Sequence, residues 1–328
     1  CGAIDVRPLI TKRFSFNDAD KAYKELLLDD SGIGTLLEYE SEELKCFSKS
    51  ISIATAVKFH HQHPNLAFIG AGNYASRILI PAFKNTDANL HTVVTANGIN
   101  SVVHGKKGGF LYASTSIDDV LRDTSVNTLI IATQHNIHAE LVVNAIDSGK
   151  NVWVEKPLAI DSAGIDSIEK SYQIHQAQNR SSLQLMVGFN RRFSPHIVKM
   201  RELLSTESLP KSLIITVNAG FIDSDHWTQN KTKGGGRIIG ECCHFIDLMR
   251  FLTGSSIVSI EGRAMVSKGD GAVIEDNASI TLGFEDGSFG TIFYLANGAS
   301  NFPKERVEVF TNGKVLQLNN FRKLSGYG

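Results

Sequence analysis

The stretch Asn65-Leu66-Ala67-Phe68-Ile69-Gly70-Ala71-Gly72-Asn73-Tyr74-Ala75 decides the fold of this chain. Its apolar run is typical of a buried strand, and the segment after the glycines has apolar residues at helical spacing. Between a strand and a helix, the pattern G-x-G-x-x-A has defined roles. The first glycine permits a tight turn, the second lets the backbone approach a pyrophosphate, and the alanine lets the helix pack closely on the strand. Gly70, Gly72 and Ala75 therefore predict a dinucleotide-binding turn, with the helix N-terminus facing the phosphates.

Strands and helices alternate downstream of this turn. Single helices between strands indicate βαβ units, so we expect an α/β fold whose N-terminal part is a Rossmann domain, a doubly wound parallel sheet. Pro81 is expected to kink the first helix, because proline lacks the N–H that a helix needs. The predicted strands are 66–69, 91–95, 126–132 and 152–154, and the predicted helices lie around 75–83, 99–107, 139–146 and 163–177.

A different pattern begins after about residue 185. Short strands are joined by Glu285-Asp286-Gly287 and by Thr311-Asn312-Gly313-Lys314, two segments with hairpin turn chemistry. Such short connections require antiparallel pairing, so we expect a C-terminal α+β domain with a large, mostly antiparallel open sheet. Its predicted strands are 212–219, 256–265, 277–284, 288–295, 304–310 and 313–318, with a helix over 238–252.

The composition excludes several classes of protein. The 328 residues suggest two domains, and 33 Lys+Arg against 34 Asp+Glu provide no positive surface for nucleic acid or acidic membranes. No apolar run reaches the roughly 18 residues of a membrane span, and no signal-peptide pattern opens the chain. The four cysteines form neither a disulfide framework nor a metal-binding spacing, which favours a reducing, cytoplasmic compartment.

The first 64 residues differ from the rest. A short strand over 10–14 precedes a helix with Asn17 or Asp18 as its N-cap, and the segment 41–64 ends in His60-His61-Gln62-His63-Pro64. These histidines are compatible with a metal site, but a solvated linker is favoured because no carboxylate or cysteine lies nearby, and we expect no metal. The expected domains are a tail and linker (1–64), a dinucleotide-binding domain (65–185) and a substrate and oligomerisation domain (186–328), the last truncated at its C-terminus.

The end of the second strand bears on the choice between NAD and NADP. An acid roughly 20 residues after the glycines would bind the ribose of NAD. The segment here is Thr95-Ala96-Asn97-Gly98, which has neither a carboxylate nor an arginine, although Lys106 and Lys107 lie one helix away. The sequence leaves both cofactors open, and Asn97 is included among the cofactor-binding candidates.

The segment Val154-Glu155-Lys156-Pro157 ends a predicted strand. A residue before proline is held in extended geometry, and ligands of parallel sheets bind at the carboxyl ends of the strands. Lys156 is therefore a candidate donor to a substrate hydroxyl, with Glu155 paired to it. The alternative is a solvated salt bridge between the two side chains.

The segment 234–247 begins with three glycines and continues as an amphipathic helix. Glu241, His244 and Asp247 fall on one polar face of that helix, at positions i, i+3 and i+6. His244 is thus a candidate for proton transfer near neutral pH, with a carboxylate one turn away. A single histidine on a helix is also often structural, and this alternative stays open.

These segments, in this order, resemble the Gfo/Idh/MocA family, the relatives of glucose–fructose oxidoreductase and inositol dehydrogenase. The resemblance covers roughly residues 65–320 and rests on the glycine turn, on 132–140, on Glu155-Lys156-Pro157 and on 234–247. It implies a nicotinamide-binding Rossmann domain and an open-sheet substrate domain. It also implies that Lys156 and His244 line the pocket and that the substrates are sugars, cyclitols or nucleotide-linked sugars.

Placement and resemblance together give three groups of candidates. The catalytic candidates are Lys156, His244 and Glu241. The substrate-binding candidates are Asn190, Arg191, Trp227 and Asp247. The cofactor-binding candidates, for NAD or NADP, are Gly70, Gly72, Asn73, Tyr74, Ala75, Asn97, Thr133, Gln134, His135, His138, Glu155 and Lys156.

Two positions depart from the family pattern. Most members have an aspartate four residues before the histidine, where this chain has Gly240, and a proline after Thr133, where it has Gln134. Glu241 is the nearest remaining acid, because helix positions three and four apart are neighbours. We expect Glu241 to support His244 or to contact the substrate, the alternative being an exposed surface charge.

Residues 1–45 resemble a different enzyme. The segments 7–14 and 19–27 are similar to the last stretch of a medium-chain alcohol dehydrogenase, which some related proteins carry amino-terminally to a Gfo/Idh/MocA module. The resemblance implies a fusion whose first catalytic domain precedes this chain, with Cys1 as an excision point.

The sequence therefore predicts an NAD(P)-dependent oxidoreductase that acts on a secondary hydroxyl or ketone of a sugar-like substrate. Lys156 would bond the reacting oxygen, and His244 would act as base or acid. Two alternatives stay open: a redox-neutral lyase or glycosidase that keeps its cofactor bound, and a non-catalytic dinucleotide-binding regulator. We expect a homo-oligomer assembled through the C-terminal sheet, with no nucleic-acid or membrane partner.

Overall fold

The structure, a computed structural model, describes residues 5–28, 33–39, 48–54, 63–178, 182–206, 209–267 and 273–328. The chain divides into two compact units, Cys1–Ile51 and Ser52–Gly328. Cys1, Cys46 and the histidines 60 and 61 lie outside the described residues. In the described part, no group of three or more His, Cys, Asp or Glu side chains is placed to hold a metal ion.

The first seven-stranded sheet is the predicted Rossmann sheet. The five strand pairs from β6 to β9 are all parallel, and the strand order is β3-β6-β5-β4-β7-β8-β9. The order reverses between β4 and β7, which creates a topological switch point at the carboxyl ends of these two strands. The strands are β3 (Ser50–Ser52), β4 (Asn65–Ile69), β5 (Asn89–Val94), β6 (Tyr112–Ser114), β7 (Thr128–Ile131), β8 (Asn151–Val154) and β9 (Leu185–Val187).

Helices cover both faces of this sheet. Because successive strand residues point to opposite faces, Ala67 and Ile69 of β4 pack in one core with α5 and α6. Leu66 and Phe68 pack in a second core with Ile80 of α2. Strands buried on both faces are typical of parallel sheets. The helices are α2 (Ile80–Lys84), α3 (Gly98–Gly108), α4 (Ile117–Arg122), α5 (His138–Asp147) and α6 (Ser162–Ala177).

The helix after the glycine turn is wound differently from the expectation. Residues Ala75–Leu79 form a π-helical segment, η4, and α2 follows with Pro81 in its first turn. A proline inside a helix removes one backbone bond, and its ring crowds the preceding turn. The wider π winding leaves room there, so rewinding of the helix accompanies Pro81.

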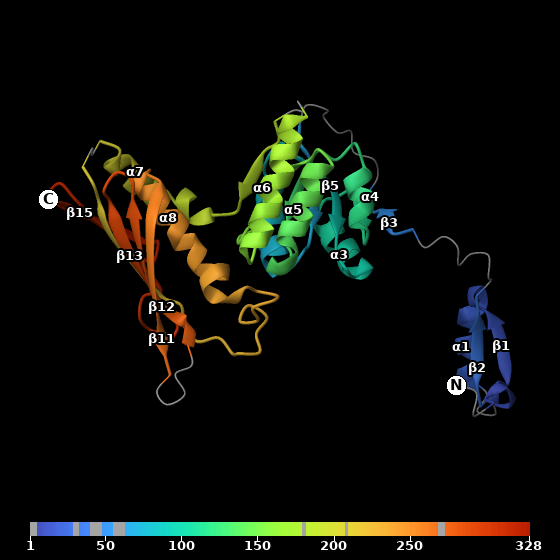
Figure 1. Ribbon diagram of the computed structural model, residues 1–328. Coiled ribbons are helices and arrows are strands. Elements are labelled where there is room, and N and C mark those ends of the chain that lie inside the picture. The colour runs from blue at the N-terminus through green and yellow to red at the C-terminus, as the bar shows by residue number, and fades with distance from the viewer. Residues whose placement is uncertain are drawn as a thin grey trace. The chain divides into compact units, whose positions relative to one another are not determined.

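The second sheet has the order β11-β12-β13-β10-β14-β15-β16. All of its strand pairs among the described residues are antiparallel except β10 with β13, so the prediction of a mostly antiparallel C-terminal sheet is confirmed. Helices α7 (Pro195–Leu204) and α8 (Cys243–Thr253) lie beside this sheet (Figure 1). They contribute Met200 and Phe245 to the core on it. The strands are β10 (Ser212–Asn218), β11 (Ile257–Val266), β12 (Val273–Phe284), β13 (Phe289–Leu295), β14 (Glu305–Thr311), β15 (Lys314–Asn319) and β16 (Lys323–Tyr327).

The smaller unit forms a βαβ arrangement of its own. Strand β1 (Lys12–Ser15) pairs in parallel with β2 (Thr35–Glu38), and α1 (Ala19–Leu28) connects them, close to the strand and helix predicted there. Ala22 is the buried residue of α1. None of the helices in the described ranges is long and apolar enough to cross a membrane.

Candidate functional site

The glycine turn lies at the switch point between β4 and β7. Gly70 has φ +96°, a conformation that favours glycine, and a Cβ added there would lie 2.4 Å from the carbonyl oxygen of Ala132. A Cβ added at Gly72 would meet nothing within 4 Å. Close packing therefore requires a glycine at position 70. At Gly72 the missing side chain leaves space in the cavity that this residue lines.

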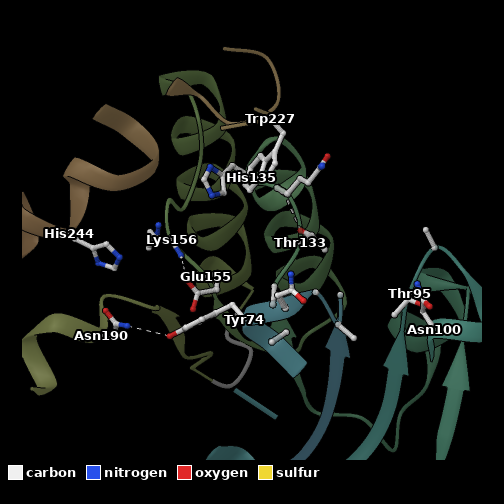
Figure 2. Close-up of a pocket in the computed structure, with 18 residues that line it drawn as sticks. Tyr74, Thr95, Asn100, Thr133, His135, Glu155, Lys156, Asn190, Trp227 and His244 are labelled. Atoms are coloured by element: carbon white, nitrogen blue, oxygen red, sulfur yellow. Dashed lines mark hydrogen bonds between the residues drawn. The ribbon is translucent and has the colours of Figure 1, made fainter. Parts of the chain in front are cut away.

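This cavity has a volume of about 740 Å³. Figure 2 shows its lining, from Thr95 and Asn100 at one end to His244 at the other. The structure thus brings the glycine turn, the strand end with Lys156 and the helix with His244 to one space. The predicted site residues that line the cavity are Gly70, Gly72, Asn73, Tyr74, Ala75, Thr133, Gln134, His135, Glu155, Lys156, Asn190, Trp227 and His244.

The lining fits a dinucleotide. The helix that begins at Asn73 opens onto the cavity, and the first N–H groups of a helix have no partner within it, so they suit a pyrophosphate. Glu155 is the one carboxyl among the described lining residues, so little negative charge opposes the phosphates. Tyr74 is held in place at the cavity by the amide of Asn190, 3.3 Å from its hydroxyl (Figure 2).

Two cofactor candidates do not line the cavity. Asn97 caps α3, because its side-chain oxygen accepts the N–H of Ile99 at 2.9 Å. The preference of asparagine for helix N-caps was the signal for this role. Thr95, Ala96 and Asn100, which the sequence reasoning did not select, line the cavity at this end instead.

His138 is the second of these candidates and is fully buried. Its Nδ1 lies 2.8 Å from the carbonyl oxygen of Pro157, and its Nε2 lies 3.3 Å from that of Thr133. The ring therefore links the segment after β7 to the strand end that carries Lys156. His138 therefore positions residues that line the cavity without lining the cavity itself.

Lys156 spans from the parallel sheet to the helix of the second sheet. Its Nζ donates a 2.7 Å hydrogen bond to the carbonyl oxygen of Gly240. The expected ion pair with Glu155 is not formed in the described structure; the carboxylate accepts the backbone N–H of Lys156 at 3.3 Å instead. Burial raises the pKa of Glu155 to about 7, although the charge of Lys156 acts in the opposite direction.

Glu155 should make the stability of the fold depend on pH. Its folded pKa of about 7 exceeds its ordinary value of 4.5, so the folded state binds more protons between these values. Stability is therefore full below the lower value and falls as the pH rises to the upper one, by at most about 3 kcal/mol. We expect Glu155→Gln, measured by urea unfolding without cofactor, to gain stability over wild type at about pH 8 and little at about pH 5. An equal difference at both pH values would contradict this assignment.

His244 projects into the cavity from α8 and is buried. Burial lowers its pKa to about 2, and the charges of Arg191, Lys156 and Lys304 add to the effect. The imidazole is therefore neutral at physiological pH, whereas the sequence favoured titration near neutrality. Its Nδ1 is buried with no hydrogen-bond partner among the described residues. A neutral ring in this position can accept a proton.

Glu241 has partners other than His244. Its carboxylate accepts the hydroxyl of Tyr294 and, at 3.2 Å, a guanidinium N–H of Arg237. The segment Ile238–Cys242 is π-helical, so the α-helical spacing that placed residues 241 and 244 side by side does not apply. Glu241 lines a second cavity of about 240 Å³ that adjoins His244, and its contact with a substrate stays a prediction.

The substrate candidates divide between the cavities and the protein interior. Trp227 and Arg191 line the smaller cavity, and Arg191 pairs with Glu305 at 2.5 Å. Asp247 lines neither cavity, because it is paired with Arg192, whose Nε lies 3.0 Å from its carboxylate. Arg237, which also lines the smaller cavity, was missed by the sequence reasoning; it directly follows the glycine run.

Comparisons with known proteins match most of the chain. The model "Oxidoreductase family, NAD-binding Rossmann fold" matches residues 65–189, and "GFO/IDH/MocA C-terminal domain" matches residues 197–315. An inositol 2-dehydrogenase of Rhizobium meliloti is 24% identical over 260 residues, which are 78% of this chain and 76% of that protein.

Two further similarities cover less sequence or only the fold. The uncharacterized oxidoreductase YrbE of Bacillus subtilis is 25% identical over 212 residues, 63% of this chain, and the match spans only 60% of that protein's length. A solved levoglucosan dehydrogenase, in complex with NADH and L-sorbose, has a TM-score of 0.65 at 18% identity, over 80% of this chain and 76% of that one. Because its parallel and antiparallel halves both match, the chain belongs to the Gfo/Idh/MocA family of NAD-binding oxidoreductases.

Proposed function

We propose that this chain is an NAD-dependent dehydrogenase or reductase for a secondary hydroxyl or ketone of a sugar, cyclitol or nucleotide sugar. One observation carries the proposal: the glycine turn, the Lys156 amine and the neutral His244 imidazole line one cavity. The printed activities of relatives, an inositol 2-dehydrogenase and a levoglucosan dehydrogenase, support a substrate of this class.

The proposed roles follow from the chemistry of each side chain. NAD, when bound, supplies the hydride acceptor for alcohol oxidation. The backbone around Gly72 would hold its pyrophosphate. Lys156 would donate a hydrogen bond to the reacting oxygen and stabilise the negative charge that develops there. His244 would accept the hydroxyl proton, because its imidazole lines the same cavity as the Lys156 amine; the lowered pKa leaves the ring unprotonated and weakly basic.

The lining favours NAD over NADP. Near Thr95 and Asn100, where the adenosine half would lie, no lysine or arginine is among the described residues of the cavity. A 2′-phosphate needs a cation such as arginine to be accommodated. We therefore assign NAD as the cofactor within this proposal.

A turnover assay tests the function and separates its rivals. The chain is incubated with NAD and a panel of myo-inositol, D-glucose and levoglucosan, and the absorbance of NADH is followed. We expect NADH to accumulate with at least one polyol. Cleavage of a glycoside without accumulation of NADH would identify the redox-neutral alternative. Binding of NADH with no turnover of any polyol would identify a regulator.

The same proposal includes the domain boundaries and the context of the chain. The segments 65–185 and 186–328 would be the cofactor and substrate domains, and 1–64 the end of a medium-chain dehydrogenase with a linker. The compact unit Cys1–Ile51, with its own βαβ arrangement, supports this division. A reducing, cytoplasmic compartment is supported by the free thiols of Cys242 and Cys243.

Assembly through the second sheet also belongs to the proposal. Its strands expose large apolar side chains, and such patches mark interfaces when they are contiguous. A homo-oligomer would cover them. By strand register, four of them share the face opposite the helices: Ile214 of β10, Phe289 and Phe293 of β13 and Phe310 of β14.

A shortened chain tests the independence of the cofactor site. The N–H of Ile53 donates to the carbonyl of Leu111 at 2.8 Å, and Ile53 packs on the core behind β4, so the shortened chain should keep β3. We expect a chain that starts at Ser48 to bind NADH within about twofold of the full chain, a difference under about 0.5 kcal/mol. A large loss of affinity in a shortened chain that still unfolds cooperatively on heating would refute this expectation.

A further inference from the structure

His135 stands where the two cavities meet. Four residues line both cavities: His135, Lys156, Trp227 and His244. Two of them, Lys156 and His244, are the groups assigned to the reacting hydroxyl in the proposed function. A substrate bound between these groups would therefore lie against the imidazole of His135.

One hydrogen bond fixes the tautomer of this ring. The Nδ1 of His135 lies 2.8 Å from the carbonyl oxygen of Gly234. A carbonyl oxygen only accepts, so Nδ1 carries the proton and donates it. Burial lowers the pKa of His135 to about 4, so the ring is neutral at physiological pH. Nε2 is then a hydrogen-bond acceptor, and no described residue donates to it.

The missing side chain at Gly240 makes room for this ring. A Cβ added at Gly240 would lie 3.1 Å from Cε1 of His135, the atom bonded to both ring nitrogens. The carbonyl of Gly240 also accepts the Lys156 amine at 2.7 Å. The lysine amine and the Cε1–Nδ1 edge of the imidazole therefore approach the same residue. The amine, as donor, and Nε2, the acceptor bonded to Cε1, belong to side chains that line both cavities. Two neighbouring hydroxyls of one substrate match this pair, one as acceptor and one as donor.

We propose that His135 is a substrate-binding residue whose Nε2 accepts a hydrogen bond from the hydroxyl adjacent to the reacting carbon. This inference rests on the proposed dehydrogenase function and narrows its substrates to vicinal diols. A substrate that fills the cavity but has hydrogen in place of the adjacent hydroxyl leaves this acceptor without a donor. Sites built around such a bond discriminate against the analogue that lacks it.

His135 also has a structural role that the test must separate. Its Nδ1 bond and the 3.1 Å bond from the N–H of Asn136 to the carbonyl of Lys233 hold the segment 227–236 in place. The Trp227 ring packs edge-on against the imidazole, with 4.7 Å between the two ring centroids. Loss of activity in an alanine variant would not distinguish this structural role from the binding of substrate by Nε2.

Two conservative variants separate the roles. In His135→Asn, the side-chain amide can replace Nδ1–H as the donor to Gly234, but nothing replaces Nε2. In His135→Gln, the longer amide reaches the position of Nε2 and gives up the bond to Gly234. His135→Asn therefore removes the Nε2 acceptor and keeps the hydrogen bond to Gly234. His135→Gln does the reverse and is its matched control.

The experiment compares each polyol that the enzyme oxidises with its analogues deoxygenated at one or the other of the two carbons next to the reacting carbon. The analogue that loses more activity identifies the hydroxyl that His135 binds. For wild type we expect at least about tenfold lower kcat/KM with that analogue, since one buried hydrogen bond is lost. His135→Asn should lose about tenfold on the polyol, discriminate less than about twofold, and keep its NADH affinity. His135→Gln should retain part of the discrimination. Binding of both ligands to the NADH complex, measured by calorimetry, gives the same comparison without turnover.

Gly240→Ala tests the same hydrogen bond between His135 and the substrate without replacing His135. Its methyl group would press on Cε1 of His135, while the backbone carbonyl still accepts Lys156. We expect weaker discrimination with unchanged NADH affinity. Gly262→Ala is the control, because the nearest atom to its added Cβ is 4.0 Å away on the second sheet.

The outcomes distinguish the role of His135 from the dehydrogenase function itself. Equal discrimination by wild type and His135→Asn, or a loss of NADH affinity in His135→Asn, would overturn the role of His135 and leave the dehydrogenase function standing. Absence of both turnover and polyol binding in wild type would overturn both.

Discussion

Replacement of Lys156 by methionine is expected to lower kcat/KM for the polyol by about 10²–10³ while NADH binds with near wild-type affinity. Methionine keeps most of the side-chain volume but cannot donate a hydrogen bond to the developing negative charge on the reacting oxygen. The loss corresponds to about 2.7–4 kcal/mol of transition-state stabilisation. Steady-state kinetics and a fluorescence titration with NADH measure the two quantities separately.

Lys199→Met is the matched control for this variant. Lys199 is an exposed lysine of α7 whose amine pairs with Glu202 on the protein surface. It should leave both kcat/KM and NADH affinity unchanged. If Lys156→Met lost its affinity for NADH and kept its turnover at saturation, the amine would serve only to tie the strand end to Gly240, and its assigned role would be wrong.

The second large effect is expected at the glycine turn. In Gly72→Leu, the new side chain would extend into the cavity, because a Cβ at this position has no neighbour within 4 Å. It would occupy the place assigned to the pyrophosphate. We expect NADH affinity to fall at least about a hundredfold, or about 2.7 kcal/mol, with little change in thermal stability.

Gly262→Leu is the control, because it adds the same side chain to a similarly open position on β11. Gly70→Ala serves as a contrast: its Cβ would lie 2.4 Å from a backbone oxygen, so stability should fall there together with affinity. If Gly72→Leu bound NADH like wild type, the glycine turn would not hold the cofactor.

The fold was largely predictable because its signals are local. The apolar run before Gly70 and the glycine spacing indicate a strand, a turn and a helix in a single segment. The hairpin residues Asp286-Gly287 and Asn312-Gly313 likewise lie between the strands that they connect. Strand β16 was missed because Lys323–Tyr327 is short and contains Gly326, which weakens the alternation.

The candidate site was predictable only where one segment determines the position of a side chain. Lys156 and His244 reach the cavity from a strand end and a helix, as expected. Asn97 was misplaced because the helix start after it competes for its side chain. Tyr294, a partner of Glu241, and Arg192, the partner of Asp247, could not be foreseen, since they are distant in the sequence. Arg237, the other partner of Glu241, lies only four residues before it and was missed.

Winding and long-range contact explain the remaining differences. The π-helical segments at Ala75–Leu79 and Ile238–Cys242 change the helical period, which the apolar pattern does not reveal. The His135 ring lies where a side chain at Gly240 would be, although the two residues belong to motifs that are distant in the sequence. Sequence spacing marked Gly240 as a departure from the family, and only the structure shows which ring takes up the space.

Transfer of deuterium is the most direct test of the central claim that this cavity passes a hydride between a polyol and NAD. The enzyme is incubated with NAD and with myo-inositol, D-glucose and levoglucosan, each carrying deuterium on all its carbons. The nicotinamide is then analysed by mass spectrometry, which detects even a single slow turnover. The account predicts one deuterium on the nicotinamide ring of the reduced cofactor with at least one polyol, and a rate of deuterium incorporation about 10²–10³ lower with Lys156→Met. Bound cofactor that carries no deuterium with any of the three polyols would contradict it.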